Sequence, residues 1–174
     1  MLDFMTIATR RTKAGIEVSP KWIMKKSKDL MIRGRDFYAI WDDERKLWSV
    51  EKEDVVRLVD LELTKYVDEH ADRFETPPIV KYMWDSDSGS VDRFNKYCQK
   101  QMWDYYHPLD ETLVFANTEL NRENYASKKL PYPLEEGSIA AYEEIVSTLY
   151  SEEERHKIEW AIGSIVSGDS KTNQ

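Results

Sequence analysis

Two aspartates in a polar stretch come closest to a catalytic pattern. Asp85 and Asp87 form a D-x-D pair, and the residues around them are serine and glycine. Two carboxylates at this spacing can share a divalent metal ion, as in polymerases and nucleotidyl transferases. The same composition is typical of a solvated turn. A metal-dependent nucleotidyl transferase or primase that uses Asp85 and Asp87 is therefore one hypothesis for this chain.

The other reactive side chains form no catalytic or metal-binding pattern. None of the three histidines has metal-ligand spacing to a second histidine or to a cysteine. Cys98, the single cysteine, falls on apolar helical positions and predicts a buried thiol. Residues 163–170 resemble half of a phosphate-binding loop, but Asp169 stands where lysine is needed, which favours a helix end. The leading interpretation therefore has no catalytic residue, no metal ligand and no cofactor in this chain.

Charge is distributed unevenly along the sequence. Residues 1–35 hold nine basic and three acidic side chains, a net charge of +6, whereas the remainder holds 16 basic and 30 acidic side chains, a net charge of −14. A basic segment on an acidic protein predicts one surface that faces a polyanion, with a solvated face as the alternative. The candidate nucleic-acid-binding residues are Arg10, Arg11, Lys25, Lys26, Arg33 and Arg35.

Aromatic residues lie within or beside this basic segment. Trp22, Tyr38, Trp41 and Trp48 could stack on single-stranded bases. Tryptophan is more often a core anchor, and core packing is the favoured interpretation for these rings.

The periodicity predicts an α+β fold, with a small β-rich N-terminal portion followed by a mainly helical body. Strands are expected at 4–9, 15–18 and 30–33, with Pro20 allowing only an edge or a break in the second of them. The runs 37–41 and 46–50 flank four polar residues and predict a hairpin.

Helices are predicted over four later segments. Apolar residues at three- and four-residue steps predict a helix that ends near His70, and similar spacing from about Ser90, including Tyr105, predicts a helix that ends at His107. Ser138 and Ser151 are candidate caps of two further helices, the second with a capping box to Glu154.

The segments between these helices set the expected domain boundaries. Residues 75–78, with two prolines, predict the main boundary, and 112–116 and 130–134 are expected to be extended. The expected organisation is a basic β-rich portion with the first helix over 1–75, a mainly helical portion over 79–168, and a frayed tail over 169–174. No apolar run approaches the ~18 residues of a membrane span, and no signal peptide opens the chain, so we expect an intracellular protein.

The order of these elements resembles the region upstream of the ATPase in phage and poxvirus-type superfamily-three primase-helicases. The resemblance is carried by the aromatic hairpin and by four later stretches. The hairpin spans 36–48 and is followed by the helix around 55–58. The four later stretches are 113–117, 130–134, 154–163 and 168–171. In such proteins the last helix is followed by a strand and the ATP-binding loop, which this sequence does not contain.

The resemblance implies a non-catalytic collar or accessory domain of a phage replicative helicase. It would support DNA binding, with single-stranded DNA as the expected partner, and homo-oligomeric ring assembly for a motor outside this chain. ATP and magnesium are then expected only for that motor, and the location is the cytoplasm of the host cell. A stand-alone interaction module, in which acidic helices dock on another replication protein, is the remaining alternative.

Overall fold

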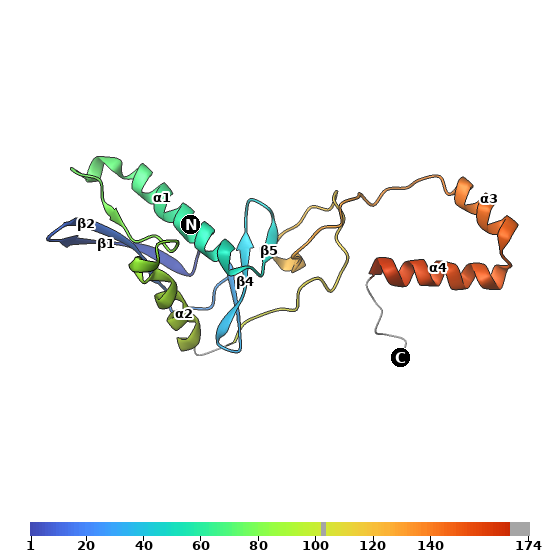
Figure 1. Ribbon diagram of the computed structural model, residues 1–174, viewed down its shortest axis with the longest axis horizontal. Helices are drawn as coiled ribbons and strands as arrows, with labels where there is room; N and C mark the ends of the chain where they lie inside the picture. The colour runs from blue at the N-terminus through green and yellow to red at the C-terminus, as the bar shows by residue number, and fades with distance from the viewer. Residues whose placement is uncertain (102–103, 168–174) are drawn as a thin grey trace. The chain divides into compact units, whose positions relative to one another are not determined.

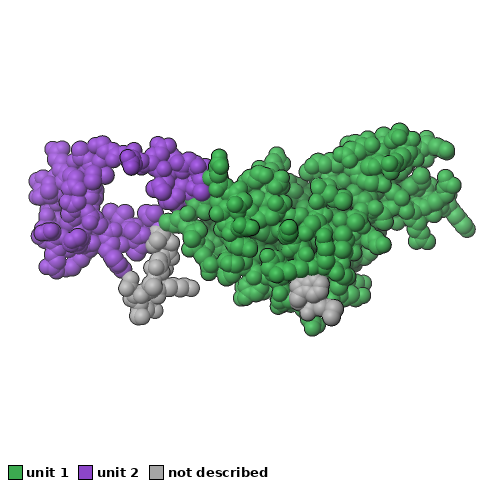
Figure 2. Space-filling view, turned by 180° about the vertical axis from the view of Figure 1, so that it is seen from behind, with its two compact units in different colours: residues 1–114, 119–129 green, residues 115–118, 130–174 purple. Residues whose placement is uncertain are grey.

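The computed structural model describes residues 1–101 and 104–167, which form two compact units. Unit 1 comprises 1–114 and 119–129, and unit 2 comprises 115–118 together with the chain from 130 onward (Figure 2). The strands lie in unit 1, which confirms the α+β class with a β-rich N-terminal portion. In chain order the elements are β1 (Met5–Thr12), β2 (Gly15–Trp22), β3 (Leu30–Arg33), β4 (Asp36–Asp42), β5 (Leu47–Ser49), α1 (Lys52–Glu69), the 3-10 turn η1 (Ala71–Arg73), β6 (Ile79–Val80), η2 (Ser86–Ser88), α2 (Ser90–Lys100), η3 (Arg122–Asn124), α3 (Ala140–Leu149) and α4 (Glu152–Ser167).

The first sheet has the order β1-β2-β6 and is built around a long hairpin. Strands β1 and β2 pair antiparallel from Met5 opposite Trp22 to Thr12 opposite Gly15, and are longer than the sequence predicts. Strand β6 pairs in parallel with only Glu17 and Val18 of β2. At Pro20 strand β2 therefore has a neighbour on the β1 side only, which is the edge position expected for a residue without an N–H group.

The second sheet has the order β3-β4-β5 and contains the predicted aromatic hairpin. Trp41 pairs with Trp48 across β4 and β5, and their rings meet edge to face at 5.7 Å. Both rings are buried, with 3% and 2% of their surface exposed, so the core interpretation holds for them. Strands β3 and β4 meet in a two-residue turn of Gly34 and Arg35, both at positive φ as a type I′ turn requires.

Helices α1 and α2 pack against both sheets of unit 1 (Figure 1). Helix α1 turns Val55, Leu58, Val59 and Leu63 inward, at the spacing that the sequence shows. Helix α2 buries Phe94, Tyr97 and Cys98 beside Phe4 and Trp22 of the first hairpin. Apolar area removed from water is the main stabilising contribution, and this shared cluster joins the N-terminal strands to α2.

The predicted boundary at 75–78 does not separate the two compact units. Beyond the prolines the chain returns to the first sheet, where the Lys81 N–H donates to the Val18 carbonyl at 2.8 Å, and Met83 is buried in the same core. The division between the units instead falls at 114–119 and 129–130. The two prolines therefore follow α1 and η1 but lie within unit 1.

The helix predicted from Ser90 to His107 is shorter in the structure. Helix α2 ends at Lys100, and Tyr105 forms an isolated antiparallel bridge with Ile32 of β3. Pro108 disfavours helical backbone before it, and the bridge provides partners for the Tyr105 N–H and carbonyl. The sequence predicts extended backbone over 112–116 and 130–134. In the structure these two segments are joined by one isolated parallel bridge, between Phe115 and Leu130.

Unit 2 contains the helices α3 and α4 that the C-terminal sequence predicts. The capping box forms as expected: the Ser151 N–H and hydroxyl donate to the Glu154 carboxylate at 2.9 and 2.8 Å. Arg155 joins the helices by pairing with both Glu143 and Glu159. Several apolar side chains of this unit are exposed, with Ile165 at 79%. Gly168, Asp169 and the predicted tail lie outside the described residues.

None of the helices in the described ranges combines the length and apolar character that crossing a bilayer would require.

Candidate nucleic-acid interface

The structure divides the six predicted basic residues into two groups. Arg10 and Arg11 lie near the turn of the β1–β2 hairpin, whereas Lys25 and Lys26 follow Trp22 at its base. At about 3.3 Å per residue the two ends of the hairpin are roughly 20 Å apart. Arg33 ends β3 and Arg35 lies in the β3–β4 turn. The structure therefore places Arg10 and Arg11 at the opposite end of the hairpin from Lys25 and Lys26.

The second group comprises Lys25, Lys26, Arg33 and Arg35. It lies beside residues 104–106, which the sequence predicts to be helical. Besides its bridge to Tyr105, β3 is held to this segment by Asp104, whose carboxylate accepts the N–H groups of Gly34 and Arg35 at 2.9 and 3.3 Å. These contacts bring the aromatic residues at 105 and 106 beside the basic residues that precede and follow β3.

Two cations of this group lie over tyrosine rings. The Lys26 ammonium is 3.9 Å from the centre of the Tyr105 ring. The Arg33 guanidinium lies 4.9 Å from the Tyr106 ring and 6.0 Å from the Tyr38 ring, and those two rings meet edge to face at 5.4 Å. We call this surface the cation–aromatic face; its members are Lys26, Arg33, Tyr38, Tyr105 and Tyr106, with Lys25, which lines a small pocket with Tyr105, and Arg35, whose backbone N–H binds Asp104.

The aromatic members are accessible to different degrees, with Tyr38 and Tyr105 half-buried and Tyr106 exposed. A hydrogen bond between the Tyr105 and Tyr125 hydroxyls, with burial, raises the pKa of Tyr125. Tyr125 in turn stacks on the His107 ring at 3.9 Å. Tyr106 is 40% exposed, so one ring remains open to a planar ligand beside Arg33. Such alternation of rings and cations is what a single-stranded nucleic acid needs for base stacking and phosphate neutralisation.

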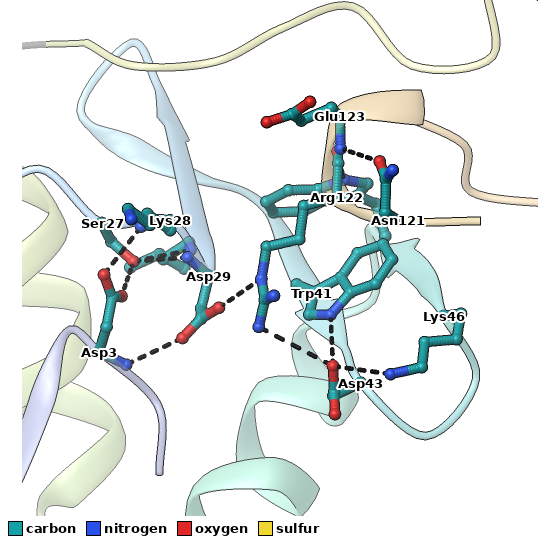
Figure 3. Close-up of polar contacts among 12 residues, drawn as sticks. Asp3, Ser27, Lys28, Asp29, Trp41, Asp43, Lys46, Asn121, Arg122 and Glu123 are labelled. Atoms are coloured by element: carbon teal, nitrogen blue, oxygen red, sulfur yellow. Dashed lines mark hydrogen bonds and ion pairs between the residues drawn. The ribbon is translucent and has the colours of Figure 1, made fainter.

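Two of the three acidic residues of the basic segment, Asp3 and Asp29, are bound by neighbouring groups. Asp3 accepts the Ser27 hydroxyl and the Lys28 N–H, and Asp29 accepts the Asp3 N–H at 2.9 Å (Figure 3). Arg122 donates to Asp29 at 2.8 Å, and its guanidinium lies 5.4 Å from the Trp41 ring. Because these carboxylates are satisfied internally, the exposed part of residues 1–35 is more cationic than its composition suggests.

The Asp85–Asp87 pair forms a capped turn. One Asp85 carboxylate oxygen accepts the Asp87 N–H at 3.0 Å at the start of η2, and the side chain of Asp87 is exposed. Across residues 1–101 and 104–167, no three His, Cys, Asp or Glu side chains are grouped as metal ligands. The Asp85 side chain thus caps η2, as in a polar turn.

Cys98 is buried, and burial raises the pKa of its thiol to about 12. The thiol is protonated at neutral pH, and a protonated thiol is a poor nucleophile. The prediction of a buried thiol is confirmed.

Tyr105 and Tyr106 are the functional candidates that the sequence reasoning missed. They lie about 70 positions from Arg33 and Arg35, and no local pattern pairs the two segments. Pro108 restricts only His107 before it, so the sequence offers no local signal that Tyr105 and Tyr106 leave the helix.

No family model matches the chain, and no curated protein or solved structure shows significant similarity to it.

Proposed function

We propose that this chain is a non-catalytic accessory domain of a phage-type replicative helicase that binds single-stranded DNA through the cation–aromatic face. The observation that carries the proposal is the placement of Lys26 and Arg33 over Tyr105 and Tyr106. The resemblance to primase-helicases supports the helicase context, including homo-oligomeric assembly and the cytoplasm of the infected host cell. ATP and magnesium belong to the motor and not to this chain.

The charge distribution supports a confined contact. With a formal net charge of −8, most of the surface repels a phosphate backbone. The strand would follow the cations of the face, and exposed bases would stack on Tyr106. Phosphate contacts release counterions, so binding is expected to weaken as salt rises.

The test is a titration of fluorescent oligothymidine with a face variant in which Lys25, Lys26, Arg33 and Arg35 are changed to alanine. Each lost phosphate contact should reduce the slope of log affinity against log salt by about 0.7. The matched control removes four exposed lysines elsewhere: Lys65, Lys96, Lys100 and Lys128. We expect the face variant to lose most of its affinity and its salt dependence, and the control to keep both. Equal losses in the two variants would contradict a localised site.

A separate pair of variants tests the stacking contribution. Tyr106→Ala removes the exposed ring and should weaken binding by about 1–3 kcal/mol, whereas Tyr106→Phe keeps the ring and should bind normally. If Tyr106→Ala binds as tightly as the original chain, stacking on this ring contributes nothing and any affinity is electrostatic.

A further inference from the structure

A groove runs along the outer face of α1, on the side that does not face the core. Its α1 wall is a helical stripe from Glu53 to Thr64, about 16 Å long, and the other walls come from Glu44, Tyr82 and Trp84. The groove is shallow and open to solvent, with a volume of about 660 Å³. Trp84 is 72% exposed, in contrast to the buried Trp41 and Trp48. Exposed tryptophan beside a groove is characteristic of a protein-binding surface, because tryptophan is enriched among residues that dominate interface energies.

Trp84 is held in a fixed place by its neighbours. The two oxygens of the Asp60 carboxylate accept the N–H groups of Met83 and Trp84 at 2.6 and 3.0 Å. Tyr82 stacks with Trp84, with ring centres 6.3 Å apart. The Met83 side chain between them is buried in the core. The backbone that presents Trp84 is therefore already ordered, which reduces the conformational entropy lost on binding.

The rim of the groove is acidic and lacks a free counter-charge. Glu44 and Glu53 are exposed, and within the part of the chain that the structure describes neither carboxylate has an ion-pair partner. Arg57 is the basic residue of the lining, and it is already paired with Asp42 and Asp54. The groove therefore fits a ligand with cationic groups and aliphatic stems, which can lie on an aromatic ring.

A surface of matching chemistry lies at the turn of the β1–β2 hairpin. Arg10, Arg11 and Lys13 are exposed there, and among the described residues none of the three has an ion-pair partner. Beyond Glu17, where β6 ends its pairing, the hairpin continues as a two-stranded arm (Figure 1). We refer to Arg10, Arg11 and Lys13 as the arm tip.

We propose that the arm tip of one copy of this chain binds the Trp84 groove of a second copy. Antiparallel pairing is continuous from Met5 to Thr12, and among the described residues the arm tip forms no ion pair with the groove of its own chain. Arginine matches this site because its planar guanidinium stacks on indole and pairs with the carboxylates of Glu44 and Glu53. The contact is head-to-tail, so each copy uses both surfaces, and repeated contacts close into a ring or continue as a filament. The inference rests on the homo-oligomeric assembly of the proposed function and is independent of its DNA contact, since it uses neither Lys26 nor Tyr106. It assigns Arg10 and Arg11 to a protein contact.

The test is complementation between two broken variants, followed by sedimentation velocity over a range of protein concentrations. The arm variant carries Arg10→Glu and Arg11→Glu, and the groove variant carries Trp84→Ala. Each alone should lose self-association by about 30-fold or more, the effect of removing an interface anchor. Mixed together they should form a one-to-one complex, because the intact arm of the groove variant meets the intact groove of the arm variant. The second contact is broken on both sides, so this complex should not grow further.

Matched controls separate the contact from general effects of charge and surface hydrophobicity. Trp160→Ala removes another exposed tryptophan, and Lys96→Glu with Lys100→Glu reverses two charges on α2. Both controls should associate like the original chain. A chain that is monomeric at every concentration, a groove variant that associates normally, or a mixture that stays monomeric would each overturn the proposal. Oligothymidine binding by the monomeric groove variant tests the DNA proposal independently, so either proposal can fail while the other stands.

Discussion

At the scale of single residues, Arg35 occupies a backbone conformation that arginine rarely adopts. Its φ is +63°, next to Gly34 at +60°, and its N–H donates to Asp104. A side chain at positive φ costs about 1 kcal/mol, and asparagine tolerates this region better. A strained cation at the edge of the cation–aromatic face is consistent with a role for its charge.

Arg35→Asn should therefore raise stability while weakening DNA binding. We expect a gain of about 0.5–1 kcal/mol in the free energy of unfolding, and a decrease of about 0.7 in the salt slope for oligothymidine. Urea denaturation and anisotropy titration measure the two effects. Lys128→Asn removes the same charge from an exposed loop and should change neither; a destabilised Arg35→Asn protein would refute the strain argument.

Arg122 joins a late segment to the N-terminal core. It pairs with the largely buried Asp29, its carbonyl accepts the Trp48 indole N–H at 2.9 Å, and it lies over Trp41. Arg122→Ala leaves the Asp29 carboxylate with fewer partners and should cost about 1–3 kcal/mol in urea denaturation. Arg73→Ala, an exposed change, should cost less than about 0.5 kcal/mol. Equal effects of the two substitutions would show that the Asp29 pair contributes nothing.

At the scale of elements, the start of α4 depends on an ionised carboxylate. Hydrogen bonds from the Ser151 backbone and hydroxyl lower the pKa of Glu154. Because the folded pKa lies below the unfolded value near 4.3, the stabilisation is present above that value and is lost as pH falls through the folded pKa. Acidification should therefore fray the first turn of α4, as followed by amide chemical shifts. In Ser151→Ala the Glu154 pKa should move back toward its ordinary value; an unmoved pKa would contradict the capping account.

The elements that could be predicted are those whose signal is local. The stripe of α1, the hairpin of β4 and β5, and the Ser151 capping box each lie within a few turns or two adjacent strands. The bridge from Tyr105 to Ile32 joins residues 73 positions apart, and helical spacing from Phe94 onward matched a continued helix equally well. The cations of the site were predictable from composition, but their aromatic partners depended on this long-range pairing.

At the scale of the whole molecule, unit 1 is completed by a segment beyond residue 114. Trp48 donates its backbone N–H to the Ala126 carbonyl at 2.8 Å, and Arg122 belongs to the same segment. A fragment of residues 1–129 should therefore unfold cooperatively near the midpoint of the full chain. A fragment of residues 1–114 loses these contacts and should be about 2–4 kcal/mol less stable, since each buried hydrogen bond contributes about 1 kcal/mol and the charged pair more. Identical denaturation midpoints of the two fragments would contradict this division.

The central claim, that single-stranded DNA lies on the cation–aromatic face, is tested most directly by photo-crosslinking. An oligothymidine carrying 5-iodouracil would be crosslinked to the chain, and the modified residues identified by mass spectrometry. The account predicts crosslinks at Tyr106, Tyr105 and Tyr38, and their loss in the variant that lacks the four surrounding cations. Crosslinks confined to Trp84 or to the β1–β2 turn, unchanged in that variant, would contradict it.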